Sequence, residues 1–250
     1  MDRFFVNPSA LADDKVVFSD EQAHQIRSVL RKKAGNKVIV LDNTGLEYEV
    51  ELAEVTHGEV TGIVLDKKKA DGEPQAELTI YQSLLTRQKF EWVLQKCTEI
   101  GVCRFVPVVC RRSLVQSSKT IKPAKMNRWQ KILKESAEQC ARGCIPKLLN
   151  PKTFKDAVEH TDRYDCKLIA VAGGKGRDLR QVVRRFDEIT KAAIFIGPEG
   201  GFTTDEIDTA KQAGFETVTF GKRVLRTETA AIVSSALFLY ELGQTNTKKS

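Results

Sequence analysis

The sequence predicts an α/β protein with two domains, a small β-barrel domain followed by a larger domain built on a parallel sheet. Short β-like segments separated by glycine-containing turns fill residues 3–82. Beyond about residue 72, apolar residues recur at three- and four-residue spacing, and strands then alternate with helices. A chain of 250 residues is long enough for two modest domains, because one hydrophobic core serves about 100 to 200 residues.

The N-terminal part is expected to consist mainly of strands. The segments RFFV, KVIVLD, EYEVELAEV, EVTGIVLDKK and ELTIYQS have the composition of short strands and together indicate a small barrel. One helix interrupts them. It begins after Ser19, which forms a capping-box pattern with Gln22, and its apolar face holds Ile26, Val29 and Leu30.

A polar segment marks the boundary between the two domains. Residues 67–75, KKKADGEPQ, contain Gly72 and Pro74 and lack apolar periodicity. We therefore expect an N-terminal domain over residues 1–72 and a C-terminal domain over residues 73–250.

The C-terminal part reads as alternating helices and strands. Phe90 to Ile100 follow the helical period, and Gly101 provides a C-cap. Apolar runs followed by helices are typical of buried parallel strands. The expected strands are 103–110, 167–172, 192–196 and 216–220, and the further helices are 129–140, 177–188, 204–213 and 228–242.

Composition narrows the function without deciding it. Forty Lys and Arg against 33 Asp and Glu give a formal charge of +7 and a pI near 9.0. This excess favours a polyanion such as nucleic acid, although a mildly basic balance can also serve solubility alone. The six cysteines form no C-x-x-C pair, so we expect reduced core residues and no metal. No apolar run approaches the roughly 18 residues of a membrane span, and a cytosolic protein is expected.

The sharpest motif is a glycine-rich loop at 197–201, GPEGG. It follows the apolar strand AAIFI and precedes a helix with its own capping-box pattern, Thr203 and Glu206. Ligands bind at the carboxyl ends of parallel strands, where glycines let the backbone approach them closely. A tight turn that needs positive φ would explain one glycine, but three in five residues favour a ligand-binding loop.

Two further loops leave strand ends in the same way. Residues 221–229, GKRVLRTET, place Arg226 and Glu228 at the start of a long apolar helix. An anion is stabilised there by unpaired amide donors, although the same pattern also fits a Glu228 that only complements the helix dipole and pairs with Arg226 on the surface. The loop AGGKGRD begins at Ala172. Together the three loops predict one pocket for a small ligand.

Several common chemistries are disfavoured. Neither the spacing of a phosphate loop nor that of a dinucleotide-binding fold is found in these glycine-rich segments. The three histidines, His24, His57 and His160, lie outside the motifs and are expected at the surface or at element boundaries. Hydrolysis based on a histidine is therefore improbable.

The motifs IGPEGGFTTDEI and FGKRVLRTETA resemble the RsmE-type methyltransferases of the SPOUT class, which methylate N3 of uridine in 16S ribosomal RNA. Four further segments agree with this resemblance: HQIRSVLRKKAG, FEWVLQKCTEIGV, VPVVCRRS and ESAEQCARGCIP. The resemblance therefore covers residues 3–243. It implies a PUA-like RNA-binding domain over 1–72 and a trefoil-knotted SPOUT domain over 73–250 for cofactor binding, catalysis and dimerisation. The implied partners are 16S rRNA, within the small ribosomal subunit, and a second copy of the chain.

The resemblance also implies S-adenosyl-L-methionine as the cofactor, bound by the three loops. The corresponding residues are Ala172, Gly173, Gly174, Ile196, Gly197, Pro198, Glu199, Gly200, Gly201, Phe220, Gly221, Val224, Leu225, Arg226 and Thr227.

Methylation of uridine N3 requires two catalytic roles. The N3 proton must leave, and the negative charge that spreads onto O2 and O4 must be stabilised. Arg226 is the hypothesis for the stabilising group, and Glu199 or Glu228 for the proton acceptor. No metal is required.

RNA also needs phosphate contacts, for which basic residues occur in several places. Arg111 and Arg112 follow a strand end and are expected at the mouth of the site, whereas Lys67 to Lys69 fit a solvated turn equally well. Gln139 and Arg142 are expected one helical turn apart in the same cleft. The remaining candidates are Arg27, Arg31, Lys32, Lys33, Lys119 and Lys122.

Two other functions fit the same sequence. One is a catalytically inert RNA-binding assembly factor, which would not bind S-adenosylmethionine. The other is a ribose 2'-O or guanine-N1 methyltransferase on the same fold, which would differ in the nucleoside that it modifies.

Overall fold

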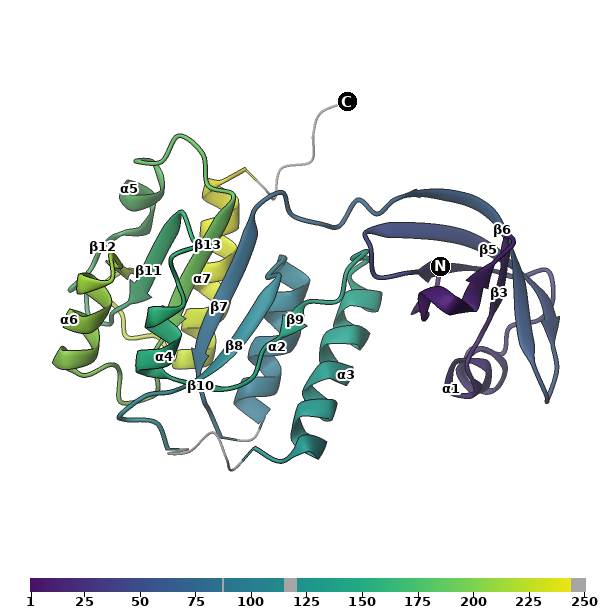
Figure 1. Cartoon of the computed structure of the whole chain (residues 1–250), viewed down its shortest axis with the longest axis horizontal. Helices are drawn as coiled ribbons and strands as arrows, with labels where there is room; N and C mark the ends of the chain where they lie inside the picture. Colours follow the sequence, from purple (N-terminus) through teal and green to yellow (C-terminus); the bar gives the residue numbers. More distant parts are fainter. Residues whose placement is uncertain (87, 115–120, 244–250) are drawn as a thin grey trace. The chain divides into compact units, whose positions relative to one another are not determined.

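The computed structural model describes residues 1–86, 88–114 and 121–243 (Figure 1). The chain divides into two compact units. Unit 1 comprises Met1–Glu73 and Lys134–Ile145, and unit 2 comprises Pro74–Leu133 and the residues from Pro146 onward. Within the described ranges, every helix is too short or too polar to cross a lipid bilayer.

Unit 1 is built on a six-stranded sheet with the order β1-β4-β5-β6-β3-β2. β1 and β4 are parallel, and the other neighbours are antiparallel. Over the described residues, β1 and β2 stay at opposite ends of this order, so hydrogen bonding does not close the sheet into the expected barrel. The strands are β1 (Arg3–Phe5), β2 (Leu11–Ala12), β3 (Lys15–Val17), β4 (Lys37–Leu41), β5 (Leu46–Val55) and β6 (Val60–Lys69).

The helix predicted after Ser19 is confirmed. α1 (Asp20–His24) has Ser19 as its N-cap, and a complete capping box joins the side chains of Ser19 and Gln22. A π-helical turn, η2 (Gln25–Val29), continues it and buries Ile26 in the core of unit 1. A short 3-10 turn, η1 (Pro8–Ala10), lies between β1 and β2.

The segment Lys134–Ile145 gives unit 1 a part that lies far from it in the sequence. Ala137 is fully buried beside Phe5, Ile39 and Leu41. Glu138 accepts a hydrogen bond from the backbone N–H of Phe5 at 2.8 Å. Local sequence patterns cannot reveal such a long-range assignment, so this segment falls outside the expected range 1–72.

Unit 2 is built on an eight-stranded sheet in which all paired strands are parallel, as predicted. Its order is β10-β8-β7-β13-β11-β14-β12, and β9 also pairs with β8. ELTIYQS forms β7 in this sheet, so its inclusion among the barrel strands is wrong. The strands are β7 (Glu77–Ser83), β8 (Arg104–Val109), β9 (Lys147–Leu148), β10 (Lys152–Thr153), β11 (Cys166–Ala170), β12 (Arg177–Asp178), β13 (Lys191–Ile196) and β14 (Glu216–Thr219).

Helices cover the sheet of unit 2 on both faces (Figure 1). α2 and α7 pack against each other, as do α4 and α6. The expected helix over 177–188 is shorter at both ends, because β12 takes its first two residues and α5 ends at Val183. The helices are α2 (Gln88–Ile100), α4 (Phe154–Glu159), α5 (Leu179–Val183), α6 (Thr204–Gln212), α7 (Thr227–Glu241) and the part of α3 (Pro123–Gln139) up to Leu133, beyond which α3 belongs to unit 1.

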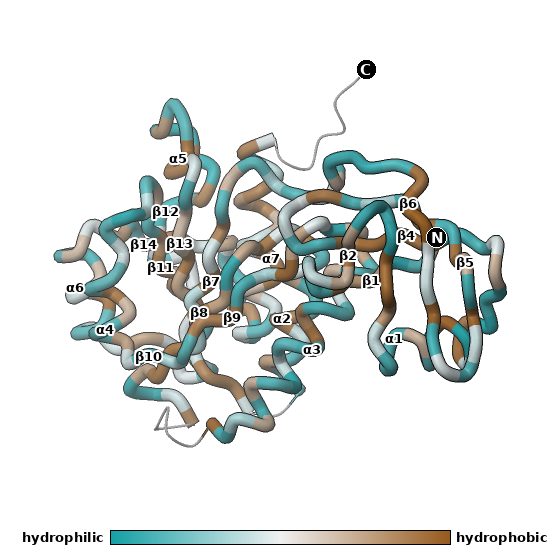
Figure 2. The backbone as a smooth tube through the Cα atoms, turned by 45° about the vertical axis from the view of Figure 1, so that its right-hand side comes forward, coloured by the Kyte–Doolittle hydropathy of each residue, from teal (hydrophilic) through white to brown (hydrophobic). Residues whose placement is uncertain are grey.

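The core of unit 2 is aromatic and apolar. The rings of Tyr81 and Phe195 stack with their centroids 4.2 Å apart, and Phe215 packs edge-on against Phe195. Figure 2 shows hydrophobic stretches along strands such as β8 and β13, while α6 is largely hydrophilic. Strands buried on both faces therefore read as continuous apolar runs, which is why the sequence pattern located them.

Three of the six cysteines are core residues as expected. Cys97, Cys110 and Cys166 are buried, whereas Cys103, Cys140 and Cys144 are partly exposed, so the expectation is wrong for these three. Burial raises the pKa of each of the three buried thiols to about 12, so none of them supplies a thiolate at neutral pH. No cluster of His, Cys, Asp and Glu suited to a metal ion occurs among the described residues.

Candidate functional site

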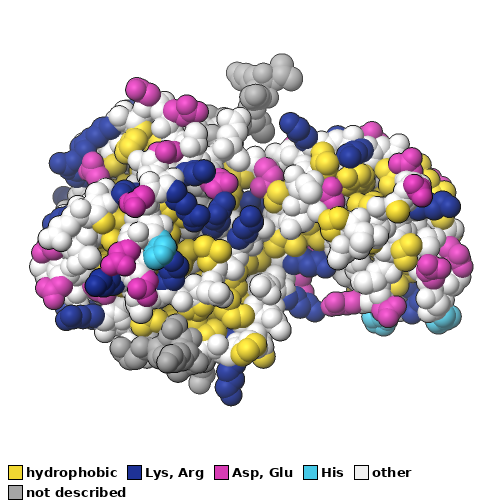
Figure 3. Space-filling view, viewed as in Figure 1, with side chains coloured by type: hydrophobic (Ala, Val, Ile, Leu, Met, Phe, Trp, Pro, Cys, Tyr) yellow, Lys and Arg dark blue, Asp and Glu magenta, His cyan; other side chains and the backbone are white. Residues whose placement is uncertain are grey.

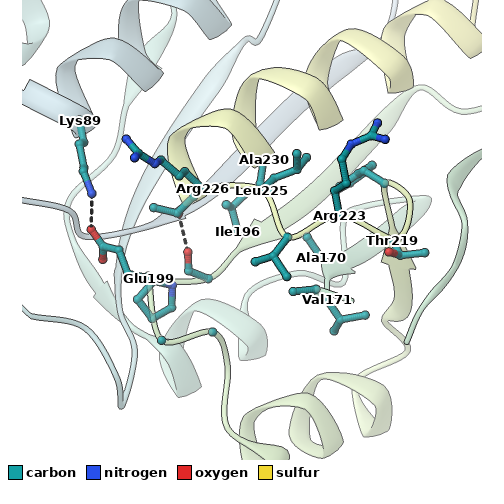
Figure 4. Close-up of a pocket in the computed structure, with 18 residues that line it drawn as sticks. Lys89, Ala170, Val171, Ile196, Glu199, Thr219, Arg223, Leu225, Arg226 and Ala230 are labelled. Atoms are coloured by element: carbon teal, nitrogen blue, oxygen red, sulfur yellow. Dashed lines mark hydrogen bonds and ion pairs between the residues drawn. The ribbon is translucent and has the colours of Figure 1, made fainter. Parts of the chain in front are cut away.

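Three loops that follow strands β11, β13 and β14 line one cavity of about 680 Å³ in unit 2 (Figure 4). β11 lies between β13 and β14 in the parallel sheet, so their carboxyl ends meet at one edge. The size is typical of a small-molecule site. The lining residues are Lys89, Ala170, Val171, Ala172, Ile196, Gly197, Pro198, Glu199, Gly200, Gly201, Thr219, Phe220, Arg223, Val224, Leu225, Arg226, Thr227 and Ala230.

Most residues expected at the cofactor lie in this lining, but three glycines do not belong to it. Gly173, Gly174 and Gly221 have positive φ values of 73°, 74° and 106°, and an added Cβ at any of them would meet open space. These glycines permit the turns that bring their neighbours to the cavity.

Six lining residues were missing from the expected set. Lys89 belongs to α2, more than 80 residues before the first of the three loops, and no local pattern connects it with them. Arg223 stands inside the motif GKRVLRTET, so its charge was a usable signal. The other four extend the strand ends or the helix start and are Ala170, Val171, Thr219 and Ala230.

Glu199 forms an ion pair with Lys89 at the edge of the cavity. Lys89 Nζ lies 3.0 Å from Glu199 Oε1, and the two side chains are 36% and 34% exposed. Such exposure keeps the pair weak and exchangeable, because water competes for both charges. The pair with Lys89 therefore keeps the Glu199 carboxylate at the cavity edge. The carboxylate can still accept a proton or pair with another cation.

Arg226 is the N-cap residue of α7 and lines the same cavity. In Figure 4 its side chain extends toward Lys89 and Glu199, whereas Arg223 lies beside Thr219 at the opposite end. Across the described ranges, no acidic side chain pairs with Arg226. Its guanidinium is available to a bound anion.

Glu228 lies in the first turn of α7, away from the cavity lining. It is only 6% exposed, and no hydrogen-bond partner for its Oε2 occurs in the described part of the chain. The surface pair between Glu228 and Arg226 that the sequence allowed is not formed among these residues.

The loop 197–201 is both a turn and a wall of the cavity. Only Gly201 among its glycines has positive φ, 68°, and its N–H donates to the carbonyl of Pro198 at 2.9 Å. Arg112 Nη1 donates to the carbonyl of Gly200 at 2.9 Å. The predicted capping box between Thr203 and Glu206 is present and begins α6 directly after this loop.

Arg112 lies beside this loop in unit 2, and Arg111 lies at the start of α6. Arg112 contributes its guanidinium to the Gly200 carbonyl. Arg111 is 72% exposed and lies 3.7 Å from Asp205, while its backbone N–H donates to Glu206. Both side chains retain donors for a phosphate.

The expected RNA contact of Arg142 is wrong. Arg142 is 2% exposed, and its guanidinium forms an ion pair with Glu73 at 2.9 Å inside unit 1. It also lies beyond the end of α3, so it is not one helical turn from Gln139. Gln139 is exposed in unit 1.

The other basic candidates differ in availability. Arg27 Nη1 donates to the carbonyl of Thr56 at 2.6 Å, and Lys32 pairs with Asp2 at 2.7 Å. Arg31 and Lys33 are exposed, and the former has a positive φ of 54°. Lys119 lies outside the described residues.

The lysine triplet 67–69 is part of β6 rather than a turn. Lys68 pairs with Glu47, and Lys67 lies over the ring of Tyr48. Figure 3 shows Lys and Arg interspersed with Asp and Glu on the viewed face.

The cavity combines an apolar middle with a charged edge. Ile196, Leu225 and Ala230 contribute apolar surface, while Glu199 and Arg226 provide a carboxylate and a guanidinium. A flat, weakly charged ligand fits such a lining, and a second reactant at the edge would meet both charges.

Comparison with known proteins agrees with this geometry. The family model of an RNA methyltransferase domain matches residues 72–239, and that of an RNA methyltransferase PUA domain matches residues 18–65. The chain is 31% identical to the ribosomal RNA small subunit methyltransferase E of Synechocystis sp. over 94% of its own length and 76% of the relative's. Identity to the enzyme of the same name from Mesomycoplasma hyopneumoniae is 32%, covering 93% and 96%.

A solved structure shares the whole fold. The chain resembles a ribosomal RNA small subunit methyltransferase E from Neisseria gonorrhoeae, bound to S-adenosyl methionine, with a TM-score of 0.83 and 28% identity over 96% and 97% of the two chains. The family models and the curated relatives cover both halves of the sequence. The chain therefore belongs to the ribosomal RNA small subunit methyltransferase E family.

Proposed function

We propose that this protein methylates N3 of uridine in 16S ribosomal RNA of the small subunit, with S-adenosyl-L-methionine as the methyl donor. The observation that carries this proposal is the single cavity at the ends of β11, β13 and β14, which holds at one edge a carboxylate and an arginine that has no acidic partner among the described residues. Membership of the methyltransferase E family supplies the reaction class.

The lining fits this cofactor. An adenosine moiety needs apolar walls and backbone groups that approach closely, and the loops at 196–201 and 219–227 offer both. Bound there, S-adenosylmethionine supplies an electrophilic methyl group. The proposed binding residues are the members of the expected set that line the cavity, together with the strand-end residues Ala170, Val171 and Thr219.

Glu199 and Arg226 divide the work on the nucleobase. N3 of uridine carries a proton at neutral pH, and the Glu199 carboxylate accepts it as the nucleophile forms. The guanidinium of Arg226 stabilises the negative charge that develops on the uridine oxygens. Lys89 holds the carboxylate at the cavity edge through its exchangeable ion pair.

The geometry favours Glu199 over Glu228 as the proton acceptor, because only Glu199 lines the cavity. We expect Glu199→Gln to lower kcat by roughly 10²- to 10⁴-fold, the usual contribution of a general base, and to weaken S-adenosylmethionine binding far less than that. Glu228→Gln is expected to cost far less. Single-turnover methylation and calorimetry measure both quantities, and the reverse ranking of the two variants would assign the role to Glu228.

Gly200 is a sensitive position in the cofactor loop. A Cβ there would lie 3.2 Å from Arg112 Cβ and 3.3 Å from its Cδ, so Gly200→Val must displace the side chain that holds the loop carbonyl. We expect about tenfold weaker cofactor binding, as for other overpacking changes. Gly58→Val is the matched control, because nothing lies within 4 Å of its Cβ position. Unchanged affinity in Gly200→Val would remove this loop from the cofactor site.

The RNA is proposed to contact basic residues of both units that are exposed or partly exposed. In unit 1 these are Arg27, Arg31 and Lys32, and the PUA family match supports an RNA-binding role for residues 1–72. In unit 2 they are Arg112, beside the loop 197–201, and Arg111, at the start of α6. We also propose a cytoplasmic location, because the proposed substrate, 16S rRNA in the small subunit, is made and assembled in the cytoplasm.

We further propose a homodimer and a deep trefoil knot in unit 2. Three large apolar side chains on the packed helices α2 and α7 support the dimer: Trp92, Leu237 and Tyr240 are 56%, 42% and 58% exposed. The knot is supported by family membership and by the meeting of β13, β11, β14 and the start of α7 at one cavity.

The decisive experiment is transfer of labelled methyl from S-adenosylmethionine to small subunits that lack the modification, followed by mass analysis of the nucleosides. The expected product is 3-methyluridine in 16S RNA. Detection of a ribose methyl group or of 1-methylguanosine would instead show that the enzyme modifies another position. If the protein did not bind the cofactor, the inert assembly factor would be favoured.

A further inference from the structure

The carboxyl end of β7 carries a buried polar side chain directly beside the cavity loops. Gln82 is 0% exposed, and its strand partner in β13 is Ile196, which lines the cavity. Gln82 Nε2 donates to the carbonyl of Ser83 at 3.0 Å and to Thr227 Oγ1 at 3.1 Å. Thr227 Oγ1 in turn donates to the carbonyl of Gly197 at 2.6 Å.

We call the chain of hydrogen bonds from Gln82 through Thr227 to Gly197 the relay, and the donor and acceptor at each of its bonds are fixed. The hydroxyl of Thr227 has one hydrogen, and the Gly197 carbonyl takes it, so the Thr227 oxygen can only accept from Gln82. The Ser83 carbonyl also requires a donor, which fixes the amide orientation with Nε2 toward both acceptors. A residue without an N–H donor at position 82 could not complete the relay.

The side chain that forms the relay also destabilises the folded state. Gln82 Oε1 is buried, and it has no hydrogen-bond partner among the residues described. An unpaired buried acceptor destabilises a folded protein, so an apolar side chain of similar length would serve packing alone equally well. The destabilisation caused by the unpaired Oε1 therefore indicates a function for the Gln82 amide beyond packing.

We propose that Gln82 is a positioning residue that sets the distance between the two loops of the cofactor site. Thr227 directly follows Arg226, and Gly197 precedes Glu199 by two residues. A bond from Gln82 through Thr227 to Gly197 therefore aligns the arginine with the carboxylate and the loop that holds the methyl donor. This role rests on the proposed cofactor site and adds to it a residue that contacts neither reactant.

Five variants of the full-length protein, Thr227→Ser among them, test the relay by calorimetry with S-adenosylmethionine, single-turnover methylation and thermal unfolding. Gln82→Met keeps the length and removes the donor, and Thr227→Val removes the central hydroxyl. The double variant measures their coupling. Thr79→Val is the matched control, because Thr79 is equally buried in β7 and accepts a hydrogen bond from Tyr164 instead.

We expect Gln82→Met to bind S-adenosylmethionine about tenfold more weakly, the upper range for one lost hydrogen bond, and to turn over more slowly. Its unfolding temperature should fall no more than that of Thr79→Val, whose cofactor affinity stays at the parent value. The double variant should lose no more affinity than Thr227→Val alone, whereas Thr227→Ser should restore binding.

Two results would overturn the role of Gln82: parent-like affinity and turnover in Gln82→Met, or losses that multiply in the double variant. Calorimetry with the cofactor needs no RNA, so a different target nucleotide would leave this test intact. Absence of binding by the parent protein would instead reject the cofactor site, and the positioning role with it.

Discussion

Arg226→Ala is expected to slow methyl transfer by about two to three orders of magnitude while the protein still folds and binds S-adenosylmethionine. Arg226 lines the cavity, and no acidic partner among the described residues holds it. Loss of a preorganised group that stabilises a developing anion costs about 10²- to 10³-fold in kcat. Single-turnover methylation of unmodified small subunits measures this loss, and calorimetry measures the cofactor affinity beside it.

Two variants test whether the loss of kcat depends on the position of the charge and on the shape of the side chain. Arg223→Ala removes an equal charge from the same loop, but Arg223 lies at the opposite end of the cavity (Figure 4), so its effect on kcat should be smaller. Arg226→Lys keeps the charge without the planar fork and should recover only part of the activity. Parent-like turnover in Arg226→Ala would exclude it from catalysis.

Local patterns in the sequence were enough to locate most of the catalytic unit. A capping box is a four-residue signal, and both predicted boxes, at Ser19 and at Thr203, are present. The buried strands of a parallel sheet are continuous apolar runs, so β11, β13 and β14 were found with their glycine-rich ends. Parallel pairing then brings those ends to one edge, which is why the cavity could be predicted.

The side chains that the sequence did not assign reach their places through tertiary contacts. Lys89 meets Glu199 across 110 positions, and Gln82 meets Thr227 across 145. Neither has a local motif, because its function depends on a partner supplied by the fold. Arg142 shows the converse error, since its sequence neighbours suggested an exposed helix face, whereas Glu73, 69 positions away, holds it inside unit 1.

Arg142→Ala is therefore expected to destabilise unit 1 rather than to weaken an RNA contact. The guanidinium is 3% exposed and the Glu73 carboxylate 25% exposed, so removing the arginine leaves a largely buried negative charge. We expect unit 1 to lose about 2 to 3 kcal/mol, below the full cost of breaking a completely buried pair. Both tryptophans, Trp92 and Trp129, belong to unit 2, so hydrogen exchange of the β4 and β5 amides is the measurement that reports on unit 1.

A double variant separates this structural role from RNA binding. In Arg142→Met with Glu73→Gln neither charge remains, so amide protection should return most of the way to the parent value, and RNA affinity should equal that of the parent. Arg184→Ala is the surface control, because Arg184 is 69% exposed and 3.8 Å from Glu241, and it should change stability by less than about 1 kcal/mol. If the double variant kept its amide protection but bound RNA more weakly, Arg142 would be an RNA contact after all, reached through an opening of unit 1.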